Sequence, residues 1–253
     1  MAISIKSSRE IDLMRQAGHI VAKVLDVLKD ACKPGITTAM LDEIARKEIV
    51  SLGGKPSFIG YMDYPAHICT SFNEEIVHGI PSDRKIEDGD VLSIDCGAIY
   101  EGYHGDSAIS LCIGDVPEET SKLVEDTRLS MVKGIESSLI GNRIGDISNA
   151  IQIYAEQRGY GIIREYVGHG IGTEMHQEPS VPNYGSSGKG LLLSKGLAIA
   201  IEPMLTLGDW QTNVGDDKWT VSTKDGSISA HWEHSIVISE DGPEVLTSLT
   251  GRP

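Results

Sequence analysis

The order helix, helix, strands occurs twice along this chain, and this duplication limits the fold more than any other feature. In the first half a capping box, Ser7 with Glu10, opens an amphipathic helix that stops before Pro34-Gly35. A second helix is expected over about 38–52, followed by strands at 56–61, 67–72 and 91–106. In the second half helices are expected from 117 and over 144–158, with strands near 161–167, 197–205 and 234–239. Periods of 20–50 residues are absent, which excludes a solenoid.

The two halves also align residue by residue. At an offset of 106 (141 − 35), four first-half positions match four second-half positions: Gly35, Leu41, Ile49 and Gly53 with Gly141, Ile147, Ala155 and Gly159. At an offset of 107 (202 − 95), Asp95 falls on Glu202. We therefore expect an α/β (α+β) protein, with halves of about 7–112 and 117–250 facing each other across a shared site.

Composition narrows the class of partner and the compartment. The 253 residues are 40% hydrophobic, and 37 acidic against 22 basic residues give a net charge of −15. Such acidity disfavours DNA and anionic membranes as partners. No apolar run is long enough to span a membrane, the N-terminus lacks a secretion signal, and the four cysteines form no CxxC pair. A cytoplasmic protein with free thiols is expected.

Two aspartates interrupt the apolar hairpin "VLSIDCGAIYEGYHGD". An ionised carboxylate among apolar residues costs several kcal/mol unless it is compensated. Asp95 and Asp106 are expected opposite or diagonal to each other, with Cβ atoms roughly 5–8 Å apart. Two metal ions about 3.5–4 Å apart would fit between them. The alternative, weighed equally, is that each carboxylate caps a turn or accepts backbone N–H bonds.

Three further residues extend this candidate metal site. Glu202 stands inside the apolar run "LAIAIEPML", Glu233 directly precedes another apolar strand, and His169 is flanked by glycines. Four carboxylates and one imidazole suit Mn, Fe, Co or Zn in a catalytic pair. Dinucleotide, phosphate-binding, HExxH and GxSxG motifs do not occur.

Five fragments in order resemble the type I methionine aminopeptidases: "HGIP", "IDCGAIYEGYHGDSA", "EYVGHGIGTEMHQEP", "IEPM" and "SAHWEHSIVIS". The resemblance covers essentially the whole chain and is closest to the short bacterial form. It implies the pita-bread fold, with pseudo-twofold halves around a central antiparallel sheet, as a single catalytic domain of residues 1–253. It also implies a monomer that removes initiator methionine from the N-terminal peptides of nascent chains when the second residue is small, with the ribosome as a transient partner.

The same resemblance assigns the site residues. Asp95 would chelate one divalent ion, Asp106 and Glu233 would bridge two, and His169 and Glu202 would complete the other. A metal-bridging hydroxide would attack the peptide carbonyl, and Glu202 would shuttle its proton. The catalytic and substrate-contacting histidines would be His78 and His176.

The implied methionine pocket departs from the family pattern, which leaves its size open. Tyr61, Tyr64, Cys69 and Trp219 match family positions, whereas Phe58, Met62 and Met175 replace other residue types. A monovalent cation at Asn73, Glu75 and Ser229 is also implied. Of the other histidines, His19, His67 and His104 are expected to be solvated or satisfied, and His231 and His234 flank Glu233 and could tune it.

Two other functions fit parts of this sequence pattern. Prolidases, aminopeptidase P and creatinases share the implied fold but usually carry an extra N-terminal domain, and here the first helix opens near residue 7. A non-catalytic peptide-binding module of the same fold would be expected to have lost ligands, and all five are present.

Overall fold

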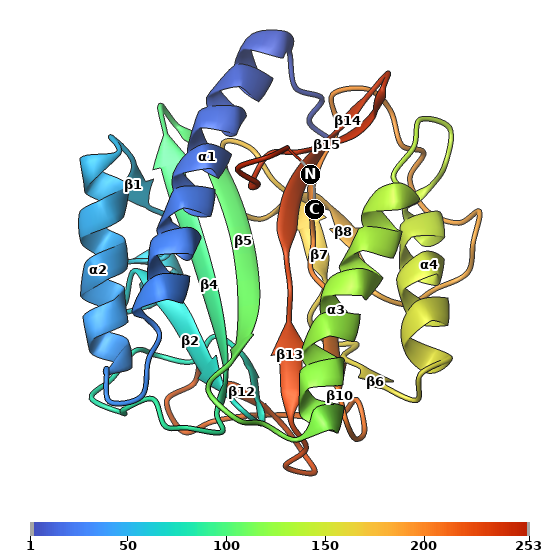
Figure 1. The fold of residues 1–253 in the computed structure, drawn as a ribbon. Helices are drawn as coiled ribbons and strands as arrows, with labels where there is room; N and C mark the ends of the chain where they lie inside the picture. The colour runs from blue at the N-terminus through green and yellow to red at the C-terminus, as the bar shows by residue number, and fades with distance from the viewer. Residues whose placement is uncertain (1–2, 252–253) are drawn as a thin grey trace.

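The computed structural model describes residues 3–251, which form four α-helices and fifteen strands in that range (Figure 1). The helices are α1 (Ser8–Ala31), α2 (Thr38–Ser51), α3 (Glu118–Glu136) and α4 (Ile144–Glu156), with a 3-10 turn η1 at Tyr61–Asp63. The strands are β1 (Lys55–Pro56), β2 (Ile68–Phe72), β3 (Glu75–Val77), β4 (Val91–Tyr100), β5 (Tyr103–Cys112), β6 (Gly161–Ile162), β7 (Gly168–Gly170), β8 (Gln177–Val181), β9 (Ala198–Ile201), β10 (Met204–Thr206), β11 (Thr212–Val214), β12 (Val221–Thr223), β13 (Ser229–His231), β14 (His234–Ser239) and β15 (Gly242–Val245).

The helix boundaries agree with the sequence prediction. Ser7 caps α1, and the carboxylate of Glu10 accepts a hydrogen bond from the Ser7 backbone N–H at 2.7 Å, as a capping box requires. The end of α2 is followed by Gly53, and the end of α4 by Gly159, with φ of +83° and +82°. Glycine adopts this left-handed conformation without steric cost, so the chain leaves each helix at a similar point of the two halves.

Two antiparallel sheets dominate the structure. In one, β4 lies between β5 and β2, with β1 also on β4; in the other, the order is β15-β14-β9-β7-β8. The pair α1 and α2 packs on the first sheet and the pair α3 and α4 on the second, so each half has its own apolar core (Figure 1). The duplicated order read from the sequence is therefore seen in space.

The two sheets meet where β5 runs beside residues 231–235. The backbone N–H of Glu233 donates to the carbonyl of Ala108 at 3.0 Å, and Ala108 N–H donates back to Glu233 at 3.3 Å. The hydroxyl of Ser235 accepts from the backbone N–H of Asp106 at 3.0 Å and donates to its carbonyl at 2.8 Å. These bonds place Asp106 of the first half beside Glu233 of the second.

Two predicted strands were wrong in extent. The expected strand at 56–61 is only Lys55–Pro56, because Gly60 and Met62 adopt left-handed conformations (φ +80° and +48°) that turn the chain through η1. The expected strand at 161–167 is confined to Gly161–Ile162.

The run 197–205 is two strands rather than one. β9 ends at Ile201 and β10 begins at Met204. Pro203 lies in the gap and has no N–H to continue the ladder. Glu202 thus stands at a strand end.

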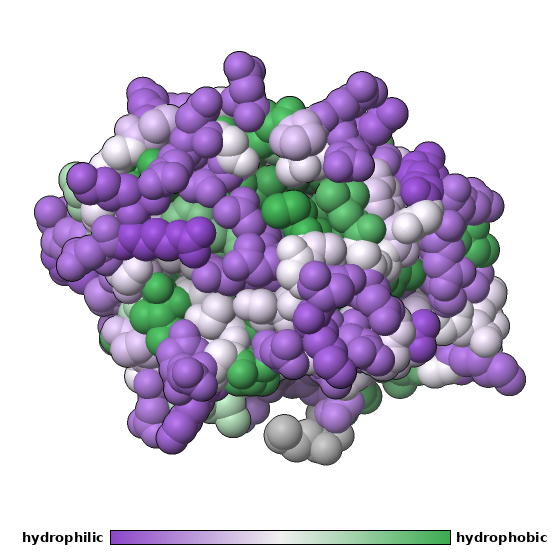
Figure 2. Space-filling view, turned by 90° about the horizontal axis from the view of Figure 1, so that it is seen from below, coloured by the Kyte–Doolittle hydropathy of each residue, from purple (hydrophilic) through white to green (hydrophobic). Residues whose placement is uncertain are grey.

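One face of the molecule, opposite the top of Figure 1, is mainly hydrophilic. Seen from below the view of Figure 1, purple side chains cover most of the face, with small apolar areas between them (Figure 2). Within residues 3–251, no helix combines the length and apolarity that crossing a membrane requires.

Candidate active site

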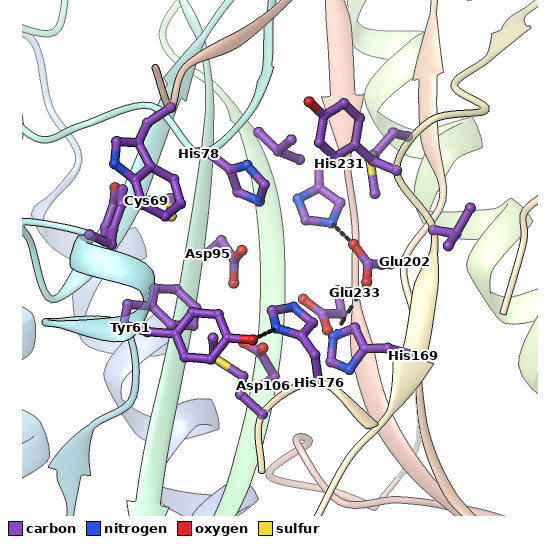
Figure 3. Close-up of a pocket in the computed structure, with 18 of the residues that line it drawn as sticks. Tyr61, Cys69, His78, Asp95, Asp106, His169, His176, Glu202, His231 and Glu233 are labelled. Carbon is purple, nitrogen blue, oxygen red and sulfur yellow. Dashed lines mark hydrogen bonds and ion pairs between the residues drawn. The ribbon is translucent and has the colours of Figure 1, made fainter. Parts of the chain in front are cut away.

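A cavity of about 200 Å³ lies between the two halves (Figure 3). All fourteen of the predicted metal and substrate residues line it: Phe58, Tyr61, Met62, Tyr64, Cys69, His78, Asp95, Asp106, His169, Met175, His176, Glu202, Trp219 and Glu233. The lining also includes five residues that the sequence prediction did not assign to the site: Val77, Tyr166, Val167, Met204 and His231.

The hairpin β4–β5 fixes the two aspartates diagonally. Asp95 pairs with Ala108, and Asp106 pairs with Gly97, so both side chains leave the same face of the hairpin. The prediction allowed opposite or diagonal positions, and the diagonal one is correct.

Strand β7 positions His169 through its glycines. A Cβ added to Gly168 would lie 2.4 Å from the carbonyl oxygen of Ala200, and one added to Gly170 would lie 2.2 Å from that of Glu178. Only glycine therefore lets β7 fit between its neighbours β8 and β9. The Nδ1 of His169 lies 3.0 Å from the Gly170 carbonyl and donates to it. Its Nε2 is then free as a ligand atom and lies 3.5 Å from Glu202 Oε1.

Three ligand atoms converge closely enough for a metal ion. One atom each of Asp106, His169 and Glu233 lie within 4.8 Å of one another. Asp106 and Glu233 are 4% and 2% exposed, so solvent does not stabilise their charges. The group joins residues from both halves of the chain.

Unpaired buried atoms show that this cavity fits a divalent cation. Within residues 3–251, Oδ1 of Asp95, Oδ1 of Asp106 and Oε1 of Glu233 have no hydrogen-bond partner. No lysine or arginine lines the cavity to compensate them. Buried carboxylates without a positive partner are strongly unfavourable, and oxygen-rich sets with one imidazole suit hard or borderline divalent metals.

The pKa values of the four buried carboxyl groups also reflect the lack of a positive partner. Burial raises the pKa of Asp95 to about 7 and that of Glu202 to about 8. Burial, and then the neighbouring carboxylates, raise the pKa values of Asp106 and Glu233 well above their usual range. A bound cation would lower these pKa values again, because it favours the ionised form of each carboxyl group.

His78 and His176 reach the cavity from separate loops. His78 is in a left-handed conformation (φ +62°), and its ring packs edge-on against Tyr166 and Trp219, with centroids 5.6 and 6.2 Å away. His176 contacts the Tyr61 hydroxyl through Nδ1 at 2.7 Å and packs against the His169 ring (Figure 3). Burial lowers the pKa of His78 to about 4 and also lowers that of His176. Both imidazoles are therefore neutral at pH 7.

An apolar slot adjoins the acids. Phe58, Tyr64, Cys69 and Met175 are buried in one cluster, and the Tyr64 hydroxyl donates to the carbonyls of Ile68 and Gly79 at 3.1 and 3.0 Å. These bonds hold the Tyr64 ring against Trp219, with centroids 5.0 Å apart. Of the three unusual residues, Phe58 and Met175 are in the wall, whereas Met62 is 76% exposed at the rim.

His231 is the polar lining residue that the sequence prediction underrated. It was expected to flank Glu233 and to be able to tune it, but its Nε2 lies 3.6 Å from a different acid, at Glu202 Oε2. Strand alternation carried the missing signal, because residues 231 and 233 project to the same side of an extended chain while 234 projects to the other. His234 indeed faces away, with Nδ1 2.9 Å from the Thr247 hydroxyl.

The remaining predicted positions behave as follows. His19 is exposed, His67 bonds Asp42 at 2.7 Å, and His104 bonds Ser57 at 2.9 Å, which confirms the prediction of solvated or satisfied side chains. The Ser229 hydroxyl donates to the carbonyls of Asn73 and Glu75 at 3.1 and 3.0 Å. These groups adjoin as predicted, and a monovalent cation there stays a prediction.

Fold and site together define a metal-dependent peptidase: the Peptidase_M24 profile, described as metallopeptidase family M24, matches residues 12–240. The methionine aminopeptidase of Clostridium acetobutylicum is 51% identical, with 97% of this chain and 98% of that protein covered. The crystal structure of methionine aminopeptidase from Thermotoga maritima is 43% identical and superposes with a TM-score of 0.96, over 98% of this chain and 100% of that one. The chain therefore belongs to metallopeptidase family M24, and within it to the methionine aminopeptidases.

The fold expectation is confirmed by the same comparisons. The structure is the pita-bread fold of this family. A prolidase from Pyrococcus furiosus shares the fold at 22% identity and a TM-score of 0.79, but this chain covers only 65% of it. The methionine aminopeptidases, in contrast, are matched over nearly their full length.

Proposed function

We propose that residues 1–253 form a single catalytic domain that removes N-terminal methionine from peptides and nascent chains whose second residue is small. The observation that carries this proposal is the set of unpaired buried carboxylate oxygens beside an apolar slot. Two divalent ions, Co, Mn, Fe or Zn, would be held by Asp95, Asp106, His169, Glu202 and Glu233. The enzyme would act as a cytoplasmic monomer, with transient contact to the ribosome.

When bound, divalent ions polarise the peptide carbonyl and make water a nucleophile near neutral pH. Glu202, at the end of β9, takes the proton of the attacking water and passes it to the leaving amine.

The two neutral imidazoles orient the substrate. His176, held by the Tyr61 hydroxyl, donates to the carbonyl oxygen as negative charge develops on it. His78 lines the cavity beside Tyr166 and Trp219, where it would contact the peptide backbone. Both act as hydrogen-bonding groups rather than as cations, because burial keeps them neutral.

The apolar slot selects the methionine side chain. Phe58, Tyr64, Cys69, Met175 and Trp219 supply soft, polarisable surface that suits a thioether. The second substrate residue then lies near the rim, where Met62 projects. A large second residue would clash with the side chain of Met62 unless that side chain moved.

The direct test is peptide cleavage by purified protein loaded with Mn²⁺ or Co²⁺. We expect free methionine from Met-Ala-Ser and no release after EDTA treatment, with circular dichroism unchanged. Cleavage of Xaa-Pro dipeptides instead of Met-Ala-Ser would indicate a prolidase-like specificity. Binding of peptides without any cleavage would indicate a non-catalytic module.

A further inference from the structure

His231 places an unpartnered nitrogen against Glu202. The side chain is only 2% exposed, and its Nε2 has no hydrogen-bond partner within residues 3–251. That Nε2 lies 3.6 Å from Glu202 Oε2, while His169 Nε2 lies 3.5 Å from Oε1 (Figure 3). The Glu202 carboxylate thus stands between two imidazoles, one facing each oxygen.

The backbone of His231 is fixed by the first half of the chain. The Ser110 hydroxyl accepts from His231 N–H at 2.9 Å and donates to the His231 carbonyl at 2.8 Å. On its other side, His231 pairs with Met204 across β13 and β10. The imidazole therefore starts from a backbone held on two sides, which is what a positioning role requires.

His231 is placed to act through Glu202 rather than on a metal ion directly. Its Nε2 faces Glu202 Oε2, whereas the close cluster of candidate ligand atoms described above is formed by Asp106, His169 and Glu233. Glu202 is also the carboxylate that approaches His231 Nε2 within 4 Å. A hydrogen bond to the outer oxygen would leave Oε1 directed toward His169 and the candidate metal site.

We propose that His231 is a positioning residue: a closure of a few tenths of an ångström from the present 3.6 Å would let Nε2–H donate a hydrogen bond to Glu202 Oε2 and so orient this carboxylate for metal binding and proton transfer. The inference rests on the proposed function, because it assigns a partner to a proposed metal ligand. Groups that orient a ligand in this way change metal affinity or activity by 10–100-fold when removed.

The test compares two substitutions that differ in one property. His231→Gln keeps an N–H donor of similar reach, whereas His231→Leu removes it at similar volume. Metal-free proteins are titrated with Mn²⁺ by calorimetry, and kcat and KM for Met-Ala-Ser are measured in parallel. We expect the Leu variant to bind one ion about 10–100-fold more weakly and to lose kcat by a similar factor with little change in KM. The Mn²⁺ affinity and kcat of the Gln variant should stay within about threefold of wild type, because glutamine restores the hydrogen-bond donor.

A matched control separates this effect from the loss of any buried histidine. His234→Gln alters a buried imidazole three residues away that bonds Thr247 and faces away from the cavity. Its metal affinity and kcat should stay within about threefold of wild type. A loss as large as that of His231→Leu would overturn the specific role of His231.

A measurement on the unmodified protein keeps the inference falsifiable if a variant fails to fold. Long-range ¹H–¹⁵N spectra of Zn²⁺-loaded protein should show His231 neutral and protonated at Nε2. An Nε2 that is unprotonated and zinc-bound would overturn the proposal, as would a Leu variant that binds Mn²⁺ like wild type. Wild-type protein that binds no ion would instead defeat the proposed function itself, so the two failures are distinguishable.

Discussion

The two halves share a plan but supply their acids differently. In the first half, Asp95 and Asp106 stand inside ten-residue strands whose ladder is continuous from Val91–Cys112 to Tyr100–Tyr103. In the second half, Glu202 follows the four-residue β9, and Glu233 lies in the break between β13 and β14. A continuous ladder holds the short aspartate side chains in fixed positions on one face of the hairpin. The glutamates, which are one methylene longer and stand at strand breaks, enter the cavity from another direction.

The halves also divide the chemistry of the cavity. The first half contributes two acids and most of the apolar slot, with His78 as its one imidazole in the cavity lining. The second contributes His169, His176 and His231 with its two glutamates. Duplication thus explains the shared backbone plan, and divergence explains why the two halves bring different side chains to the cavity.

The largest loss of activity is expected from substitution of Asp106, the residue that the first half contributes to the metal cluster. Asp106→Asn should lower kcat/KM for Met-Ala-Ser by at least ~10²-fold, because it removes charge from the group formed with His169 and Glu233. Metal content measured by mass spectrometry should fall in parallel. Asp42→Asn is the matched control: Asp42 is in the same half but bonds His67, so activity should be retained. Full activity of Asp106→Asn would contradict the site.

The next largest loss of activity is expected from substitution of His78 and His176, the two imidazoles that reach the cavity from separate loops. His78→Ala and His176→Ala should each lower kcat by about 10²-fold while changing metal affinity only a few-fold. Each ring is outside the close ligand cluster. Calorimetric titration beside steady-state kinetics makes the distinction. If either substitution empties a metal site, that histidine belongs to the ligand set.

Specificity for the second substrate residue should show a smaller effect. Met-Leu peptides are expected to be cleaved more than tenfold less efficiently than Met-Ala peptides, since each methylene forced into a crowded site costs ~1–3 kcal/mol. Met62→Ala should narrow this ratio several-fold, because Met62 projects at the rim. Paired competition assays with both peptides measure the ratio directly. Equal cleavage of both peptides by wild-type protein would contradict the proposal that the rim at Met62 disfavours a large second residue.

The stability of metal-free protein should depend on pH through one acid of each half. The folded state raises the pKa of Asp95 from 3.8 to about 7 and that of Glu202 from 4.5 to about 8. The folded protein therefore holds protons that the unfolded chain has released, so the stability these groups contribute below pH 4 is lost as pH rises to 8. The buried histidines, whose pKa values are lowered, are neutral in both the folded and the unfolded state above pH 7, so the acids are tested between pH 7 and 8.5. We expect the Tm of metal-free protein to fall by about 3 °C over this range, and that of metal-loaded protein to fall less. A rise in the Tm of metal-free protein between pH 7 and 8.5 would contradict the burial of these acids.

Local signals were sufficient to predict much of this molecule. The caps and glycine stops set the helices, and the apolar hairpin with two acids was visible as a sequence pattern. Strand β4, which carries Asp95, and strand β9, which precedes Glu202, each lie between antiparallel neighbours. The caps, the glycine stops and the hairpin depend on residues close together in the chain.

Unusual local backbone conformations and long-range contacts account for the features that the sequence did not predict. The turn at Gly60–Asp63 follows from left-handed backbone conformations, which "PSFIGY" does not reveal. The contact of His231 with Glu202 depends on β13 meeting β10 and on Ser110 from the other half. Strand alternation predicts the side that His231 faces, but only the fold shows which acid it meets.

We propose that both halves together hold two divalent ions on which methionine removal depends. Metal-free protein, prepared with a chelator and shown to be folded by circular dichroism, is titrated with Mn²⁺ while native mass spectrometry counts bound ions and Met-Ala-Ser cleavage is followed. The account predicts no cleavage without metal, binding of up to two ions per chain, and activity that rises with their binding. Full cleavage by rigorously metal-free protein, or an active protein that binds no divalent ion, would contradict it.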